Sequence, residues 1–272
     1  MSKSPSTGPP PPPLVCLTTV GREGGSGPTV TARIQLSISG QPVRFEITVP
    51  TEPVRLRELL PAFQGLTDVA VQIAVRNTEQ EGWAVSCQKG CGACCRQPVP
   101  ISESEARAIR QLVDSMPEPR CSQVRTRFHE ARVRLAAAGL LEPFLRPTQR
   151  GATEKQALAM SYFRLGLACP FLVDESCSIH PNRPVACREY LVTSAALCCA
   201  RPTAETIRIL PMPAKVSGVL RAMDKATSES GTGWLALSLA LDWSQAHPQE
   251  ALLRPGPAWV EEFFKLLAKA TG

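Results

Sequence analysis

Apolar residues alternate with polar ones near the N-terminus and recur at helical spacing over most of the remaining chain. Between residues 34 and 49 nearly every second residue is apolar, and the alternation is interrupted at Gly40 and Pro42. A period of two is typical of a half-buried strand, and such a break between two runs favours a hairpin. We therefore expect a β-hairpin ahead of a mainly helical chain.

Helical periodicity begins near residue 54, and the segment 54–81 predicts two short helices. Ser102 and Glu105 have the spacing of a capping box, in which a hydroxyl and a carboxylate each satisfy a backbone donor at a helix start. Helices are predicted at 102–116, 122–138, 153–166, 213–226, 233–246 and 257–270. The expected fold class is mainly α with a small N-terminal β-hairpin, with helices around a loop-rich cysteine cluster.

The composition is that of a globular protein. Of 272 residues, 43% are hydrophobic and 20% are charged, and no apolar run approaches the roughly 20 residues that cross a bilayer. Residues 1–15 contain a proline tract where a secretory signal needs a continuous apolar stretch. We therefore expect a soluble, cytoplasmic protein with no membrane partner.

The net charge of +6 comes largely from arginines. Between residues 103 and 130 these arginines are interspersed with acidic residues along the predicted helices. Such mixing favours a solvated surface over a nucleic-acid patch, so a nucleic-acid partner is not expected from the charge pattern.

Eleven cysteines in a protein expected in a reducing compartment point to metal ligation or redox chemistry rather than disulfides. The first group has the pattern C-x-x-x-C-x-x-C-C and consists of Cys87, Cys91, Cys94 and Cys95. Two or three intervening residues let a short turn direct successive sulfurs at one metal. Gly90 and Gly92 are expected to provide the positive-φ corners that such turns often need.

Adjacent side chains usually diverge, so Cys94 and Cys95 are expected to face different destinations. Either they serve two nearby metal centres, or one is a ligand and the other a reactive or packed thiol.

The second group consists of Cys169, Cys177, Cys187, Cys198 and Cys199. With the first group, and with one of the last two, it makes eight thiolates, which suffice for two tetrahedral sites. Thiolate ligation suits both zinc and iron–sulfur clusters, so the identity of the metal is open. The two isolated cysteines, Cys16 and Cys121, are expected to be packing residues.

Four other residues near the second group are candidates for a role at the predicted metal centre. His180 is a minor candidate for an additional ligand, because cysteines are already plentiful. Arg183, Arg188 and Tyr190 could hydrogen-bond the sulfurs or bind an anion, or they could form ordinary surface contacts.

These cysteines and their neighbours resemble the YkgJ-type cysteine-cluster family, described as zinc- or iron-chelating CxxxCxxCC proteins. The resemblance is carried by residues 87–95, the CPFL run at 169–172, the Arg-Pro pair at 183–184 and the CREY run at 187–190. It covers about residues 87–199 and implies a bacterial cytosolic protein that binds zinc or an iron–sulfur cluster.

The family resemblance also leaves other functions open. One branch is similar to flagellin lysine N-methylases, which implies a cluster-dependent enzyme acting on a protein substrate. A third hypothesis is a zinc-stabilised adaptor that binds protein or nucleic acid. The spacing of the first three clustered cysteines equals that of radical S-adenosylmethionine enzymes, but the flanking sequence lacks the repeated strand–helix units of their barrel. No residue is assigned a catalytic role.

From these features we divide the chain into four parts. Residues 1–28, rich in Pro, Gly, Ser and Thr, are expected to be a disordered tail, because they bury too little to offset chain entropy. Residues 29–84 hold the hairpin and first helices, 85–200 the metal-binding domain, and 201–272 a helical region packed on it.

Overall fold

The protein is described by a computed structural model that covers residues 14–18, 27–38, 40–145, 151–203, 205–228, 233–248 and 252–271. The strands are β1 (Leu14–Thr18), β2 (Thr29–Ile38), β3 (Gln41–Pro50), β4 (Pro53–Val54), β5 (Pro100–Ile101), β6 (Leu172–Val173), β7 (Ser176–Cys177), β8 (Leu235–Ala236) and β9 (Arg254–Pro255). The α-helices are α1 (Leu60–Gln80), α2 (Glu103–Asp114), α3 (Arg120–Ala137), α4 (Leu141–Leu145), α5 (Ala152–Arg164), α6 (Val185–Glu189), α7 (Ala196–Cys199), α8 (Val216–Thr227), α9 (Ala240–Ala246) and α10 (Gly256–Thr271). Short 3-10 helices are η1 (Leu56–Leu59), η2 (Ala93–Arg96), η4 (His180–Asn182) and η5 (Leu237–Leu239). The mainly helical class with an N-terminal hairpin is confirmed.

The predicted hairpin is formed by β2 and β3, which pair antiparallel from Thr29 opposite Pro50 to Ile38 opposite Gln41. β1 pairs parallel with β3, so the sheet order is β1-β3-β2. Alternate residues of β3 are buried, which gives the sheet one apolar face: Val43, Phe45, Ile47 and Val49.

β1 lies within residues 1–28, where the sequence predicts a disordered tail, and the structure differs there. Its sequence, LVCLT, follows the proline tract and is rich in residues that favour strands, so it can add to the edge of the hairpin. Residues 1–13 and 19–26 of the predicted tail lie outside the described residues.

The prediction of two short helices in 54–81 is wrong, because a single 21-residue helix, α1, follows η1. Phe63, Leu66 and Ile73 are all buried and continue one apolar stripe along the helix. A glycine inside a helix costs only about 1 kcal/mol, so Gly65 does not break an element whose stripe is buried.

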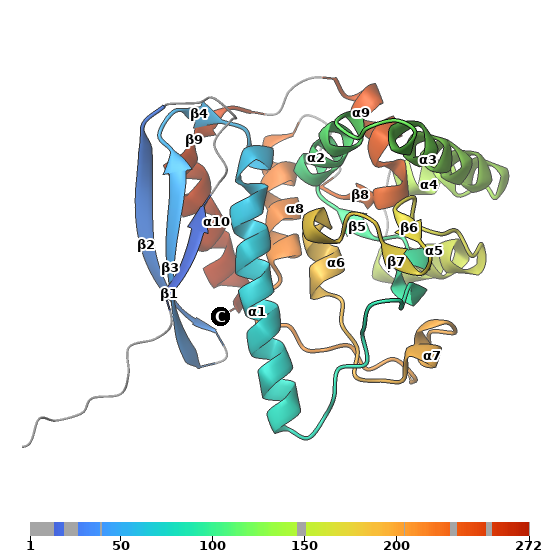
Figure 1. Ribbon diagram of the computed structural model, residues 1–272, viewed down its shortest axis with the longest axis horizontal. Coiled ribbons are helices and arrows are strands. Elements are labelled where there is room, and N and C mark those ends of the chain that lie inside the picture. Colours follow the sequence, from blue (N-terminus) through green and yellow to red (C-terminus); the bar gives the residue numbers. More distant parts are fainter. Residues whose placement is uncertain are drawn as a thin grey trace, which may run out of the picture.

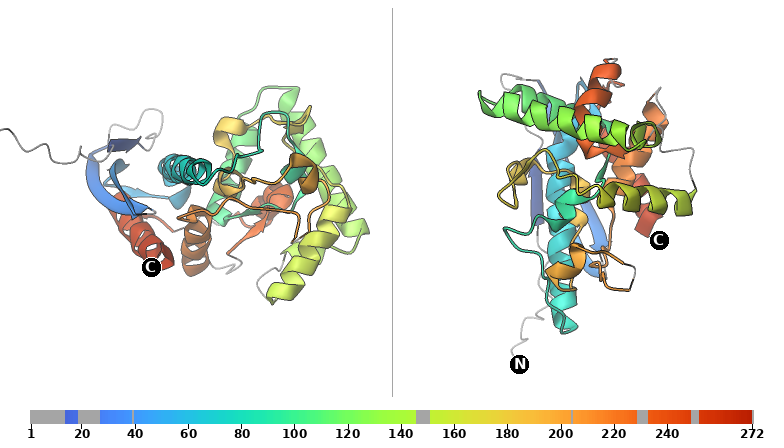
Figure 2. Two further views of the ribbon diagram at one scale, coloured as in Figure 1. Left: turned by 90° about the horizontal axis from the view of Figure 1, so that it is seen from below. Right: turned by 90° about the vertical axis from the view of Figure 1, so that its right-hand side faces the viewer.

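The apolar face of the sheet, α1, α8 and α10 enclose a first hydrophobic core. Phe63 of α1 stacks on Phe263 of α10 with ring centroids 4.1 Å apart. The indole of Trp259 donates a 2.9 Å hydrogen bond to the Val54 carbonyl, which ties α10 to β4. This core lies toward one end of the long axis of the molecule (Figures 1 and 2).

A second core joins α2, α3 and α9 toward the other end of the molecule (Figure 1). Cys169, Cys177 and Cys187 pack against it as partly buried residues. The helix predicted at 233–246 begins only at Ala240, because residues 235–236 instead form β8, which pairs with β5. A third, smaller cluster lies between the end of α3, α4 and α5.

The start of α2 connects these cores. The predicted capping box is present: Glu105 N–H donates to Ser102 Oγ at 3.2 Å, and Ser102 N–H donates to Glu105 Oε2 at 2.8 Å. Asp224 of α8 accepts two further bonds, from Ser104 N–H at 2.8 Å and from Ser104 Oγ–H at 2.7 Å. The first turn of α2 is therefore held both by its own side chains and by a helix of the first core.

Among the helices that the structure describes, none is both long enough and apolar enough to cross a membrane.

Asp224 gives a test of this junction. Burial raises the pKa of its carboxyl from 3.8 to about 6, so the carboxyl stabilises the fold when protonated, and that contribution is lost as the pH rises through about 6. Asp224→Asn keeps an oxygen acceptor for Ser104 but does not titrate. We expect urea denaturation to show that the free energy of unfolding of the variant, relative to that of the native protein, rises by about 1 kcal/mol between pH 5 and pH 7.5, because only the native protein loses stability over this range. A difference that stays constant over this range would contradict the buried, titrating carboxyl.

Candidate metal centre

Three segments that are far apart in the sequence meet beside the second core: residues 86–97, 169–178 and 185–199 (Figure 1). The Cys169 N–H donates to the Cys95 carbonyl at 2.7 Å, and the Ser86 N–H donates to the Val192 carbonyl at 2.9 Å. The Val192 N–H in turn donates to the Cys87 sulfur at 3.4 Å. Backbone hydrogen bonds therefore hold the two predicted cysteine groups against each other.

The two glycines of the first cysteine group serve different purposes. Gly90 has φ +88° and provides the expected positive-φ corner. Gly92 has φ −93°, so the same expectation for it is wrong. A Cβ at Gly92 would overlap the Glu175 carboxylate and the Leu172 side chain, so a larger residue would force these side chains to move, because the 169–178 segment approaches closely.

The approaching segment is a tight hairpin, β6–β7. Its two turn residues, Asp174 and Glu175, have φ values of 47° and 55°, as a two-residue turn between twisted strands requires. The Arg96 guanidinium makes a bidentate ion pair with Glu175 and also donates to the Gly92 carbonyl at 2.9 Å. The cysteines on either side of this hairpin, Cys169 and Cys177, are thereby placed next to the first group.

Two buried carboxylates position α6, which carries Cys187. Glu105 Oε1 accepts a 2.8 Å bond from the Val185 N–H at the start of the helix. Glu189 at its end accepts bonds from the Ser217 N–H and hydroxyl of α8. Burial raises the pKa of both Glu105 and Glu189.

The thiols of Cys95, Cys169, Cys177 and Cys187 are partly buried, and they act on one another and on Cys94. Burial, followed by the sulfurs of Cys177 and Cys94, raises the pKa of Cys169 to about 12. Burial also raises the pKa of Cys187 well above its ordinary value, with contributions from Cys169, Cys94 and Cys177. The pKa of Cys95 is raised by its hydrogen bond to Cys94, by burial and by the sulfurs of Cys94, Cys169 and Cys187.

Burial and neighbouring sulfurs also act on Cys199, which is buried, and on Cys87 and Cys94, which are partly buried. Burial raises the pKa of Cys87, to which the sulfurs of Cys94 and Cys91 add. Burial likewise raises the pKa of Cys199, and the sulfurs of Cys87, Cys91, Cys94 and Cys198 contribute. Cys94 differs, because a hydrogen bond with Cys95 lowers its pKa to about 7 and favours a thiolate near neutral pH. The structure thus places all nine predicted cysteines in one neighbourhood.

All the cysteines that the structure describes in full are free thiols. Within the described ranges, no three His, Cys, Asp or Glu side chains already point at one position as a closed ligand set. A thiol changes direction by rotation about χ1 without movement of the backbone, so nearby cysteines can converge on an ion while the segments stay in place. What the fold supplies is the proximity of the cysteine-bearing segments.

The surroundings of Arg183 are consistent with a metal bound by thiolates at this place. Its Nε is buried and has no hydrogen-bond partner within the described part of the chain, although such donors are nearly always satisfied. Its positive charge lies near the sulfurs of Cys87, Cys94 and Cys177. A positive charge near thiols suits sulfurs that carry negative charge, as metal-bound thiolates do.

The other three candidates, Arg188, His180 and Tyr190, have different surroundings. Arg188 forms an ion pair with Asp68 of α1, at 2.7 Å and 2.9 Å, and donates to the carbonyls of Arg183 and Pro181. It therefore shapes the loop before α6. His180 is exposed, and the charge of Arg183, then partial burial, lowers its pKa. Tyr190 accepts a 3.4 Å bond from the Gln97 amide beside the thiols.

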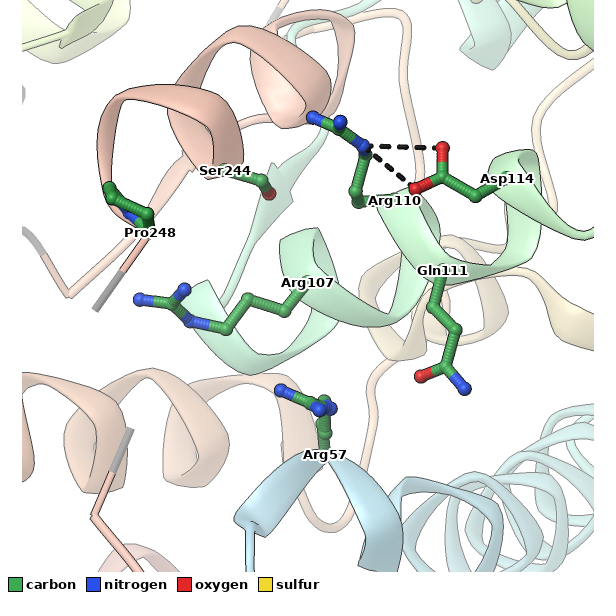
Figure 3. A pocket seen from close by; sticks show the side chains of 7 residues that line it. All are labelled: Arg57, Arg107, Arg110, Gln111, Asp114, Ser244 and Pro248. Carbon is green, nitrogen blue, oxygen red and sulfur yellow. Dashed lines mark hydrogen bonds and ion pairs between the residues drawn. The ribbon is translucent and has the colours of Figure 1, made fainter. Parts of the chain in front are cut away.

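A separate hollow lies away from the cysteines. It has a volume of about 280 Å³ and is lined by Arg57, Arg107, Arg110, Gln111, Asp114, Ser244 and Pro248 (Figure 3). Arg110 points toward Asp114, with which it pairs at 3.0 Å. Because no cysteine lines this hollow, it is not part of the thiol neighbourhood.

Comparison with known families bears on these three segments. Residues 86–202 match the model of a family named CxxCxxCC, described as a "putative zinc- or iron-chelating domain". We refer to residues 86–202, which this family model covers, as the CxxCxxCC domain. The CxxCxxCC domain contains all nine clustered cysteines, together with Arg183 and the whole of α2, α3 and α6. Comparison with curated proteins and comparison with solved structures each found no match to the chain.

Not every cysteine of the CxxCxxCC domain is near the cluster. Cys121 is buried in the second core, and its sulfur accepts a 3.4 Å bond from Arg125 Nε, as expected of a packing residue. The other isolated cysteine, Cys16, precedes this domain and lies in β1, and its side chain is outside the described residues.

Arg183 and Arg188 form a matched pair for a test. Arg183→Met removes the unpartnered donor beside the thiols, and we expect metal affinity to fall on the order of 10–100-fold in competition with a chelator. Arg188→Met removes the ion pair with Asp68 instead, so we expect a lower melting temperature with a smaller change in affinity. Equal metal affinity in the native protein and Arg183→Met would exclude the role given to Arg183.

Proposed function

We propose that this chain is a bacterial cytoplasmic metal-binding protein whose CxxCxxCC domain holds zinc or an iron–sulfur cluster through cysteine thiolates. The observation that carries the proposal is the meeting of three distant segments that bear the clustered cysteines. The charged side chain of Arg183, whose buried Nε has no partner among the described residues, lies near the sulfurs of Cys87, Cys94 and Cys177. A reducing compartment suits the free thiols of the described residues.

The proposed ligands come from Cys87, Cys91, Cys94, Cys95, Cys169, Cys177, Cys187, Cys198 and Cys199. The segments that carry them have little regular structure: α6 spans five residues and α7 four. A structural thiolate site can contribute on the order of 10–16 kcal/mol, which is enough to hold such segments in place.

Bound metal would supply either a closed structural or electron-transfer centre, or a Lewis-acidic or redox-active one if a coordination position stays open. The protein's own residues prepare the site for either case. Arg96 and Glu175 fix the hairpin that separates Cys169 from Cys177, and Arg183 places a positive charge beside the thiols. Cys169 and Cys187 are partly buried, because they pack against the second core.

The identity of the metal can be decided on anaerobically purified protein. Elemental analysis combined with an absorption spectrum should find either colourless protein loaded with zinc, or brown protein that contains iron and acid-labile sulfide. Folded, reduced protein that contains neither zinc nor iron would remove the proposal.

The ligand assignment has an internal control in the same domain. Cys187→Ser should lose bound metal, because it removes one of the proposed thiolate ligands. Cys121→Ser should keep the native metal content, because Cys121 lies in the second core among apolar residues. Metal content per folded chain after gel filtration is the measurement, and equal values for the two variants would contradict the assignment.

A further inference from the structure

One polar stripe of α2 forms a wall of the hollow shown in Figure 3. The residues of this stripe follow one another at helical spacing and so share one side of the helix: Arg107, Arg110, Gln111 and Asp114. Arg57 of η1 and Ser244 of α9 also line the hollow. The hollow therefore lies between three elements, and we call it the arginine hollow.

Positive charge exceeds negative charge among the residues that line the arginine hollow. Three of these residues are arginines, and Asp114 is the one acidic residue among them. Its carboxylate is shared, because Arg110 pairs with it at 3.0 Å and Arg125, which does not line the hollow, pairs with it as well. Arg110 uses Nε for this pair, so its two terminal amino groups can bond to another acceptor.

The guanidinium of Arg107 is held in place with one donor unsatisfied. Its Nη1 donates a 2.7 Å bond to the His247 carbonyl, and its central carbon lies 5.0 Å from the centre of the Trp243 ring. Its Nε is buried and has no hydrogen-bond partner in the described part of the chain, and the same holds for the indole N–H of Trp243. Arginine and tryptophan side chains have donors only, so the group missing beside them is an acceptor.

The charge of Arg107 also favours an anion at this place. Burial has the largest effect on its pKa and lowers it, although Glu103 and Asp224 act in the opposite direction. A further negative charge close to this cation would therefore stabilise it. In Figure 3, Arg57 extends from η1 toward α2 on the side where Arg107 lies, so an anion in the hollow can meet guanidinium groups from two elements.

A phosphate group has the chemistry that these side chains favour. Its oxygens accept paired, charge-assisted hydrogen bonds from a guanidinium group, and a dianion can balance more than one cation. The volume of the arginine hollow, about 280 Å³, is at the small end of the range for ligand pockets. The size therefore suits a small phosphate ester rather than a large cofactor.

We propose that the arginine hollow binds the phosphate group of a small metabolite, with Arg57, Arg107 and Arg110 as its cationic contacts. Arg107 provides a guanidinium that is already oriented by His247 and Trp243, so little side-chain freedom is lost when the ligand binds. No cysteine lines the hollow, so this site is separate from the metal centre and goes beyond the proposed function.

Calorimetric titration of the full-length protein at constant ionic strength tests the site, with inorganic phosphate and glycerol 3-phosphate as the two probes. We expect the ester to bind at one site per chain with a Kd below about 1 mM, and inorganic phosphate to bind at the same site more weakly. Arg107→Met keeps an apolar stem over Trp243 but removes the cation. It should raise the Kd of the ester about tenfold or more, as loss of a charged hydrogen bond does.

Arg110 and Arg125 form a matched pair of variants, because both pair with Asp114 and only Arg110 lines the arginine hollow. Arg110→Met should raise the Kd of the ester about tenfold, and Arg125→Met should keep the native Kd. If Arg107→Met does not fold, this comparison still decides the point. Both variants should keep the native metal content, which separates loss of phosphate binding from damage to the metal centre.

Three results would overturn the proposal. The first is the absence of saturable binding of either probe to the native protein. The second is an unchanged Kd in Arg110→Met, which would place the bound phosphate elsewhere on the molecule. The third is tighter binding of succinate than of either phosphate probe, which would make the ligand a dicarboxylate instead.

Discussion

The arrangement of the cysteine region depends on one buried carboxylate, that of Glu105. One of its oxygens closes the capping box at Ser102, and the other accepts the Val185 N–H that begins α6, each at 2.8 Å. The side chain is 3% exposed, so neither bond can be replaced by water. Loss of either acceptor would leave a buried donor unsatisfied at a cost of about 1–3 kcal/mol. Cys187 lies two residues beyond Val185, so a helix cap in the folded core sets the place of a proposed ligand.

The thiols alone cannot account for the meeting of the three segments. Thiol–thiol hydrogen bonds are weak, and ionised sulfurs that lie near one another repel. The pKa values of Cys169 and Cys187 are raised first by burial and then by the neighbouring sulfurs, in keeping with this repulsion. The attraction must come from elsewhere. Backbone hydrogen bonds, the ion pair of Arg96 with Glu175 and the two buried glutamates hold the segments together. A bound cation would reverse the remaining repulsion between thiolates.

The sequence predicts correctly those helices and strands that are determined by residues close together in the chain. The hairpin follows from alternation, the start of α2 follows from the spacing of Ser102 and Glu105, and α3 follows from its apolar stripe. Errors arose where a distant partner decides the outcome. β8 forms instead of a helical turn because it pairs with β5, which lies far earlier in the sequence: Pro100 is opposite Ala236, and Ile101 is opposite Leu235.

For the site, the sequence predicts which cysteines would bind metal, but it does not predict how the segments that carry them are held. The crowding at Gly92 comes from Leu172 and Glu175, which no local pattern connects to it. Arg183 and Arg188 look equivalent in the sequence, yet one has a buried Nε without a partner among the described residues and the other is satisfied by Asp68 and two carbonyls. Their different surroundings follow from α1, which brings Asp68 to only one of them. A residue's role at a thiolate site therefore depends on which neighbours have already satisfied its hydrogen bonds, and the unsatisfied donor is the one that remains to interact with the sulfurs.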